Sequence, residues 1–154
     1  MANIEQSIDV DVPVRTAYDQ WTQFAEFPRF MEGVESVTQL DDTRLHWVAE
    51  IAGKREEWDA IITEQTPDQR VAWTNTSGAK NAGVVTFHHL SDTATRVMLQ
   101  LDYEPEGVVE HVGSALGFLS RRVEGDLERF KQFIEARGHE TGAWRGTVAQ
   151  RADG

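Results

Sequence analysis

Residues 108–137 constrain the fold more than any other part of the chain, because their pattern is typical of one long amphipathic helix. Apolar residues recur along this run at steps of three and four: Val109, Val112, Leu116, Leu119, Val123, Leu127, Phe130 and Ile134. At about 1.5 Å per residue, the helix would be roughly 45 Å long. A helix of that length with one buried face needs a large sheet wrapped around it, and this arrangement tends to leave a cavity.

The segments before this helix have the composition of β-strands and are separated by turn residues. Strands are predicted at residues 3–10, 34–40, 44–52, 55–65, 70–77, 83–90 and 95–104. Two short helices are predicted after the first strand, one beginning at Pro13 and one carrying Phe30 and Met31 before Gly33. The order predicts an α+β fold, in which a seven-stranded curved antiparallel sheet surrounds a long C-terminal helix.

The turn at Gly53-Lys54 predicts how the two strands around it are paired. A two-residue turn there would place Leu45 opposite Ile62, Trp47 opposite Ala60 and Ala49 opposite Trp58. If Thr66 then lies opposite Gln69, three further side chains share that face, namely Val71, Trp73 and Asn75. In the next strand we expect Val85 and Phe87 to point inward. The inner face of the sheet is therefore predicted to be rich in aromatic side chains.

Length and composition bound what the chain can be. Its 154 residues suit one domain, predicted at 1–137, with a flexible tail at 138–154. The absence of cysteine excludes disulfides, thiolate metal sites and a thiol nucleophile. A net charge of −11 opposes nucleic-acid binding. No secretory signal and no transmembrane segment is legible, so we expect a cytoplasmic protein.

Metal and cofactor chemistry has little support in the sequence. The neighbouring His88 and His89 point to opposite faces of a strand and cannot chelate one ion together. No zinc motif and no nucleophile elbow of the Gly-x-Ser-x-Gly type occurs. We therefore predict no metal site and no cofactor.

The predicted order of elements resembles the helix-grip fold of the START and polyketide cyclase/dehydrase superfamily (SRPBCC). Four local features carry the resemblance: Val12-Pro13, Phe27-Pro28, Trp58 and the run 103–107 before the last helix. Within the superfamily the chain is similar to small bacterial cyclase/dehydrase-like and coenzyme Q-binding START-type proteins. The resemblance implies a hydrophobic cavity between sheet and long helix, entered near the second short helix. It does not name the ligand, because the fold hosts many functions.

The resemblance to aromatase/cyclase members implies aromatic, serine and arginine side chains along the fourth strand. Here that strand, residues 55–65, holds Trp58, and beyond it neither alternation phase supplies serine or arginine. This departure favours ligand binding over cyclisation. The tryptophans of the predicted sheet suit a pocket, because each indole N–H needs a polar partner that a ligand or water can supply.

The sequence thus predicts binding of a lipid-like, quinone-like or polyketide-like molecule by a carrier, chaperone or sensor. The predicted ligand-binding residues are Trp47, Trp58, Trp73, Asn75, Phe87, Leu101 and Tyr103 from the sheet, Val112, Leu116 and Leu119 from the long helix, and Phe27, Phe30 and Met31 at the entrance. Tyr103 and Asn75 would orient the polar end of the ligand. One alternative is a polyketide cyclase or dehydratase with Tyr103 or Glu56 in proton transfer. Another is a protein-interaction module with a filled core, and the oligomeric state, monomer or dimer, stays open.

Overall fold

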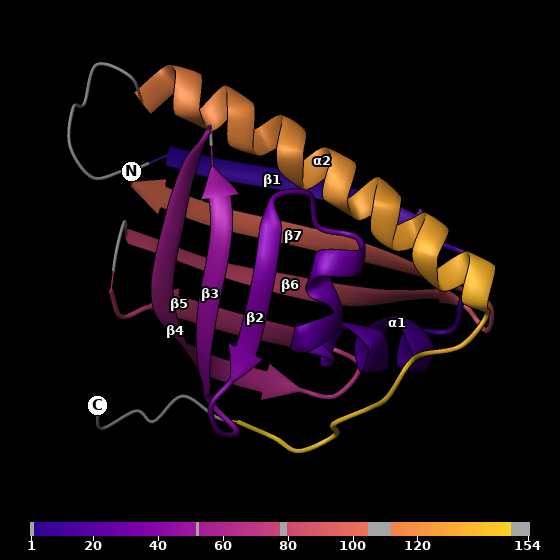
Figure 1. The fold of residues 1–154 in the computed structure, drawn as a ribbon. Coiled ribbons are helices and arrows are strands. Elements are labelled where there is room, and N and C mark those ends of the chain that lie inside the picture. Colours follow the sequence, from indigo (N-terminus) through magenta and orange to yellow (C-terminus); the bar gives the residue numbers. More distant parts are fainter. Residues whose placement is uncertain (1, 52, 78–79, 105–111, 149–154) are drawn as a thin grey trace.

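The computed structural model describes residues 2–51, 53–77, 80–104 and 112–148 (Figure 1). Its elements follow in this order: β1 (Ala2–Val10), α1 (Val14–Trp21), the 3₁₀-helix η1 (Phe24–Arg29), β2 (Val34–Gln39), β3 (Arg44–Ile51), β4 (Lys54–Thr66), β5 (Arg70–Asn75), β6 (Lys80–Ser91), β7 (Ala94–Glu104) and α2 (Val112–Arg137). The predicted order of a strand, two short helices, six strands and a long helix is confirmed. The predicted start of the long helix, at 108–111, lies outside the described residues.

The seven strands form one antiparallel sheet in the order β1-β7-β6-β5-β4-β3-β2. The sheet curls, so that β2 and β3 stand in front of β6 and β7, and α2 runs diagonally across its open side (Figure 1). Helices α1 and η1 close the end of the half-barrel near the C-terminus of α2. The predicted α+β helix-grip architecture is therefore confirmed.

The pairing of β3 with β4 differs from the prediction. Trp47 lies opposite Trp58, and Leu45 lies opposite Ala60, so each residue is displaced by two positions along the partner strand. The cause is the turn: Ile51 pairs with Lys54, and Gly53 adopts φ +83°, a backbone conformation that glycine tolerates. Side chains alternate with a period of two, so a shift of two residues leaves every side chain on its predicted face.

The β4–β5 pairing contains a bulge that the sequence analysis did not predict. Near the turn Thr66 pairs with Arg70 rather than with Gln69, and the register then shifts between Ile62 and Glu64. Beyond the shift Ile62 lies opposite Trp73, on the inner face. The bulge therefore corrects the offset that the turn introduces, and β5 presents its predicted face to the interior.

The core lies between the inner face of the sheet, α1 and α2. Its fully buried side chains include Val71 and Val85 from the sheet, and Phe130 and Ile134 from α2. Trp21 of α1 occupies the centre, with ring centroids 5.1 Å from Phe130, 5.4 Å from Phe27 and 6.4 Å from Phe87. These tilted and edge-on contacts between aromatic rings pack the short helices against α2 and the sheet.

Residues 138–148, here called the C-terminal strap, lie along α1 and end beside β4. The side chain of Gln20 exchanges two hydrogen bonds with Thr141, one from Nε2 to Oγ1 and one from the Thr141 N–H to Oε1. Val148 forms an antiparallel bridge with Gln65, with backbone N–O distances of 2.7 and 2.9 Å. These contacts continue the packing of the molecule to Val148, and the flexibility predicted for residues 138–154 stays a prediction.

Candidate functional site

A cavity of about 170 Å³ lies between the inner face of the sheet and α2. Its lining is apolar over most of its surface and includes Trp21, Phe24, Phe27, Met31, Leu45, Trp47, Trp58, Ile62, Trp73, Leu99, Leu101, Leu119 and Val123. A cavity of about 150 Å³ with apolar walls is large enough to bind benzene, whereas drug-sized ligands need about 300–1,000 Å³. The cavity as it stands therefore suits one small aromatic group or a short acyl chain.

Aromatic rings shape the wall of the cavity on the side of β3, β4 and β5. The indoles of Trp47 and Trp58 stack at 5.7 Å with an interplanar angle of 8°, and Phe27 lies 5.7 Å from Trp47. The ring of Trp73 lies over Gly83, where a β-carbon would come within 2.5 Å of it. Glycine at position 83 therefore allows Trp73 its place in the wall.

The structure places the predicted ligand-binding residues in three groups. Seven line the cavity: Phe27, Met31, Trp47, Trp58, Trp73, Leu101 and Leu119. Phe30 and Phe87 do not line it, because Phe30 packs against Phe130 and Phe87 is covered by Tyr18 of α1. Both are at most 5 % exposed and belong to the filled core.

The remaining predicted residues either do not line the cavity or have side chains that lie outside the described residues. Asn75 does not line the cavity, because its amide spans the β5–β6 turn, where Nδ2 donates to the Ser77 carbonyl and Oδ1 accepts from the Asn81 N–H. Glu56 is partly exposed beside Lys54, at 3.7 Å, and is not in the lining. The side chains of Tyr103, Val112 and Leu116 lie outside the described residues.

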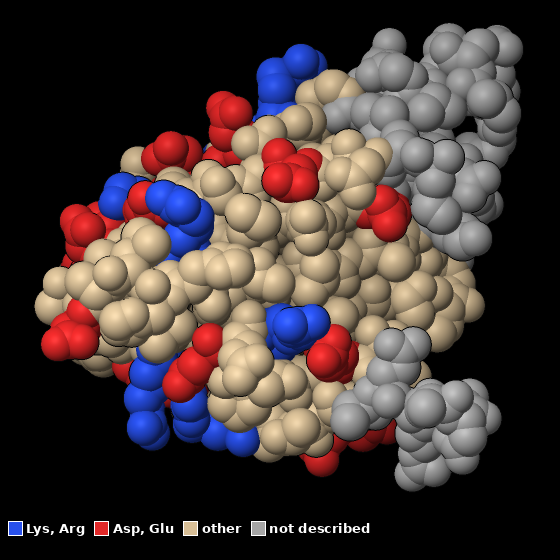
Figure 2. Space-filling view, turned by 180° about the vertical axis from the view of Figure 1, so that it is seen from behind, with Lys and Arg blue, Asp and Glu red and all other residues tan. Residues whose placement is uncertain are grey.

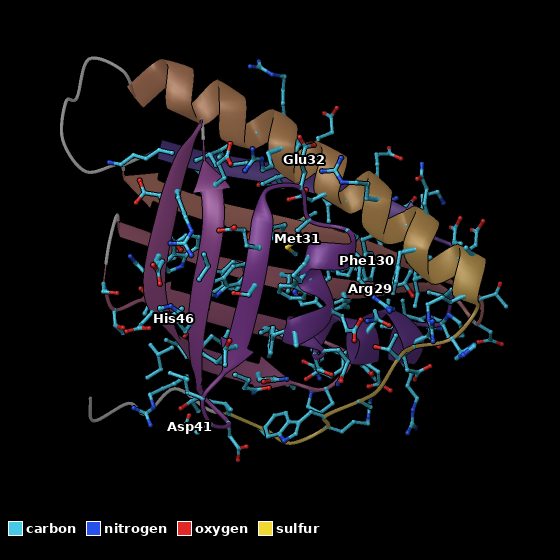
Figure 3. The ribbon with its side chains drawn as sticks, viewed as in Figure 1. Arg29, Met31, Glu32, Asp41, His46 and Phe130 are labelled. Carbon is cyan, nitrogen blue, oxygen red and sulfur yellow. The ribbon has the colours of Figure 1, made fainter. Side chains whose placement is uncertain are left out.

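The charged rim of the cavity was missed by the sequence analysis. Glu32, Arg122 and Asp126 line the cavity together with Asn81. The spacing of Arg122 and Asp126, one helical turn apart beside the apolar stripe of α2, was the available signal. Only the fold brings Glu32 to them, since it lies in the segment between η1 and β2, below α2 (Figure 3).

Asp126 and Arg129 of α2 bind residues 30–33, and Arg122 of the same helix reaches Glu50 of β3. We call Arg122, Asp126 and Arg129, together with residues 30–33, the mouth clamp. Asp126 Oδ1 accepts a hydrogen bond of 2.9 Å from the Glu32 N–H, and Arg129 Nε donates to the Phe30 carbonyl at 2.9 Å. Arg122 donates to the Glu50 carbonyl across Gly33, where φ is +83° and a β-carbon would collide with the guanidinium. Glu32, Arg122 and Asp126 of the mouth clamp line the cavity together with Met31.

Asp126 is the most perturbed acid of this rim. Burial raises the pKa of its carboxyl from 3.8 to about 6, and the hydrogen bonds from Arg129 and the Glu32 N–H only partly oppose this. Its side chain is 15 % exposed. A carboxyl that titrates this close to neutral pH can exchange a proton with a ligand in the cavity.

The raised pKa of Asp126 predicts a specific pH dependence of stability. The folded protein holds the proton more tightly than the unfolded chain, so this group lowers stability as pH rises from about 4 to about 6. Asp126→Asn removes this titration, and its unfolding free energy relative to wild type is expected to rise by about 2.4 kcal/mol between pH 4 and pH 7. Urea unfolding at both pH values measures this, with the exposed Glu124→Gln on the same helix as control. A parallel pH response of Asp126→Asn and wild type would refute the shift.

A second hollow, of about 490 Å³, lies on the outer face of the sheet. It is shallow and half polar, and small side chains such as Thr74 and Ala82 line it beside Gln100. In the view from behind, charged side chains gather toward one side of the molecule and leave the middle largely uncharged (Figure 2). Trp73 is the one aromatic residue in the described lining of this hollow, whereas several aromatic rings line the inner cavity, so the inner cavity is the better candidate site.

Within the described ranges, no group of three or more histidine, aspartate or glutamate side chains is arranged to hold a metal ion. No helix in that part of the chain is both long and apolar enough to span a bilayer. The chemistry available at the inner cavity is therefore apolar enclosure, ring stacking, and hydrogen bonding or proton exchange at the mouth clamp.

A curled antiparallel sheet that holds an apolar cavity against a long C-terminal helix defines the class of helix-grip proteins. Residues 10–132 match the model of the family described as polyketide cyclase/dehydrase and lipid transport, and the chain belongs to this family. An uncharacterized 17.2 kDa protein of Streptomyces lincolnensis is 60% identical over 149 residues, which cover 96% of this chain and 99% of that protein.

Solved structures share the fold at low sequence identity. A Thermus thermophilus protein superposes with a TM-score of 0.78 at 20% identity, covering 88% of this chain and 99% of its own. The Zhui aromatase/cyclase of Streptomyces sp. R1128 superposes with a TM-score of 0.76 at 13% identity, covering 93% of this chain and 99% of its own. A START superfamily protein of Mycobacterium smegmatis superposes with a TM-score of 0.68 at 15% identity, covering 82% of this chain and 97% of its own. These likenesses confirm the fold, and with the family match they confirm the predicted superfamily.

Proposed function

We propose that this protein binds a hydrophobic or aromatic small molecule in the cavity between the sheet and α2, as a carrier, chaperone or sensor. The observation that carries the proposal is the apolar cavity walled by the stacked rings of Trp47 and Trp58. Protein interiors are otherwise close-packed, so apolar side chains that face an unfilled pocket are costly unless a ligand covers them. The family description, which includes lipid transport, supports the same function.

Native mass spectrometry of the protein purified from its own host without detergent tests the proposal. We expect a discrete noncovalent adduct above the 17.4 kDa chain. Trp58→Ala is expected to lose the adduct, because it removes one ring of the stacked pair. Trp144→Ala, which removes an indole outside the cavity lining, is expected to keep it. A bare mass, with no later uptake of quinones, fatty acids or aromatic polyketides, would contradict the proposal and favour an interaction module.

A second candidate function is polyketide-type cyclisation or dehydration, and one specific observation favours it. Asp126 lines the cavity, and burial raises its pKa to about 6, close to the value that suits a general acid or base at neutral pH. This makes Asp126 a better placed candidate than Glu56, which is not in the lining. The predicted role of Tyr103 stays a prediction. Turnover lost in Asp126→Asn or Tyr103→Phe, with ligand affinity retained, would favour this enzyme over a carrier.

A further inference from the structure

The charged groups of the cavity gather at one end. The charged residues of its lining, Glu32, Arg122 and Asp126, all belong to the mouth clamp, and Asn81 lies apart from them on β6. Aromatic and aliphatic side chains form the rest of the wall. A ligand that leaves no buried polar group unsatisfied must therefore have an apolar body and turn its polar end toward the mouth clamp.

Asp126 is the acceptor available at that end. Its two hydrogen bonds within the described protein, from the Glu32 N–H and from Arg129 Nη2, both end on Oδ1. Oδ2 belongs to the same largely buried carboxyl and takes part in neither bond. A carboxylate oxygen in a partly desolvated site forms a strong, charge-assisted hydrogen bond with a ligand donor.

The charges around Asp126 select the kind of donor. Acidic and basic side chains stand side by side there, and Arg129 already pairs with both Glu32 and Asp126, so a charged ligand group of either sign meets repulsion as well as attraction and also loses its hydration. A neutral hydroxyl avoids both costs and can still donate to the carboxylate. The stacked indoles of Trp47 and Trp58 favour a flat aromatic ring as the apolar body.

We propose that the cavity selects neutral hydroxylated aromatic compounds, whose hydroxyl donates a hydrogen bond to Oδ2 of Asp126. This inference rests on the proposed binding function and adds to it the chemical class and orientation of the ligand. The volume of about 170 Å³ limits the enclosed part to about one substituted ring.

Two nearly isosteric ligands test the inference on the unaltered protein. Para-cresol and para-xylene differ only in a hydroxyl that replaces a methyl group, so their apolar contacts in the cavity are almost the same. Isothermal titration calorimetry is expected to show para-cresol binding about tenfold more tightly, as one charge-assisted hydrogen bond predicts. Benzoate and benzylammonium are expected to bind at least roughly tenfold more weakly than para-cresol, because each must give up its hydration beside charges that already pair with one another.

The variant Asp126→Asn tests whether the preference for para-cresol over para-xylene depends on Oδ2 of Asp126. The asparagine keeps an oxygen for the Glu32 N–H but puts an NH₂ donor in place of Oδ2. We expect the preference for para-cresol to fall to about twofold or less, while para-xylene affinity changes little. The matched control is Glu124→Gln, which removes an exposed charge from the same helix and is expected to keep the tenfold ratio.

The possible results distinguish a failure of the hydroxyl assignment from a failure of the proposed binding function. Equal affinity for para-cresol and para-xylene in the wild type would overturn the hydroxyl assignment and leave the binding function standing. An unchanged ratio in Asp126→Asn would overturn the role of Oδ2. Binding of none of the four compounds, together with a bare mass from the native host, would overturn both.

Discussion

Arg145→Ala is expected to lower the free energy of unfolding by about 2 kcal/mol, because the buried carboxylate of Asp19 then keeps only its longer ion pair, 3.7 Å, with the exposed Arg15. Asp19 of α1 is 1 % exposed and accepts a hydrogen bond from Arg145 of the C-terminal strap. The guanidinium also pairs with Asp68 at 2.9 Å and lies 5.6 Å above the ring of Tyr18. Chemical denaturation at pH 7 measures the loss.

The pH dependence of the Arg145→Ala effect follows from the same contact. Burial raises the pKa of Asp19, and Arg145 opposes this, so the variant should raise the pKa further. A carboxyl that binds its proton more tightly when folded loses stability as pH rises through that range. The cost of Arg145→Ala is therefore expected to be small near pH 4 and to grow toward pH 7. Asp19→Asn in the Arg145→Ala background should restore most of the loss, and equal stability of wild type and Arg145→Ala at pH 7 would contradict the role of the strap.

Gly83→Ala is expected to weaken ligand binding more than about tenfold. A β-carbon at position 83 would lie 2.5 Å from the ring of Trp73, so the indole must move into the cavity of about 170 Å³. Overpacking of this kind also costs about 1–3 kcal/mol of stability. Titration of para-cresol, together with thermal unfolding, separates the loss of space from the loss of stability.

Two further variants control this prediction. Trp73→Phe combined with Gly83→Ala should recover part of the affinity, because the smaller ring makes room for the new methyl group. Ala82→Ser adds atoms at the neighbouring residue, which faces the outer hollow, and is expected to leave affinity unchanged. Full affinity in Gly83→Ala would show that Trp73 does not limit the cavity.

The fold was predictable because its signals are local and periodic. The apolar stripe of residues 112–134 predicts a long helix, and alternation along each strand predicts which side chains face inward. The β3–β4 register was wrong by two residues and the bulge after Ile62 was not foreseen, yet Trp47, Trp58 and Trp73 face the cavity as predicted. Inward orientation depends only on parity, whereas exact pairing depends on turn geometry.

The site was predicted only in part, because a lining residue must also be left uncovered by its neighbours. Phe87 points inward as expected but packs under Tyr18, so it belongs to the core and not to the cavity. Trp21 was not among the predicted ligand-binding residues, yet it lines the cavity from α1. The packing of the sheet, α1 and α2 against one another decides which apolar residues line the cavity. The pattern of residues along the sequence does not contain that information.

The sequence alone determined the element order, the α+β class and the aromatic inner face, because helix and strand periodicities are properties of neighbouring residues. Only the tertiary structure decided where the polar end of the cavity lies. Glu32, Asp126 and Arg129 form the mouth clamp across a long separation in the chain. Likewise, the burial of Asp19 under Arg145 arises when the strap folds back along α1. The raised pKa of Asp126 and the apolar cavity both require that groups from distant segments come together and leave water, and only folding brings this about.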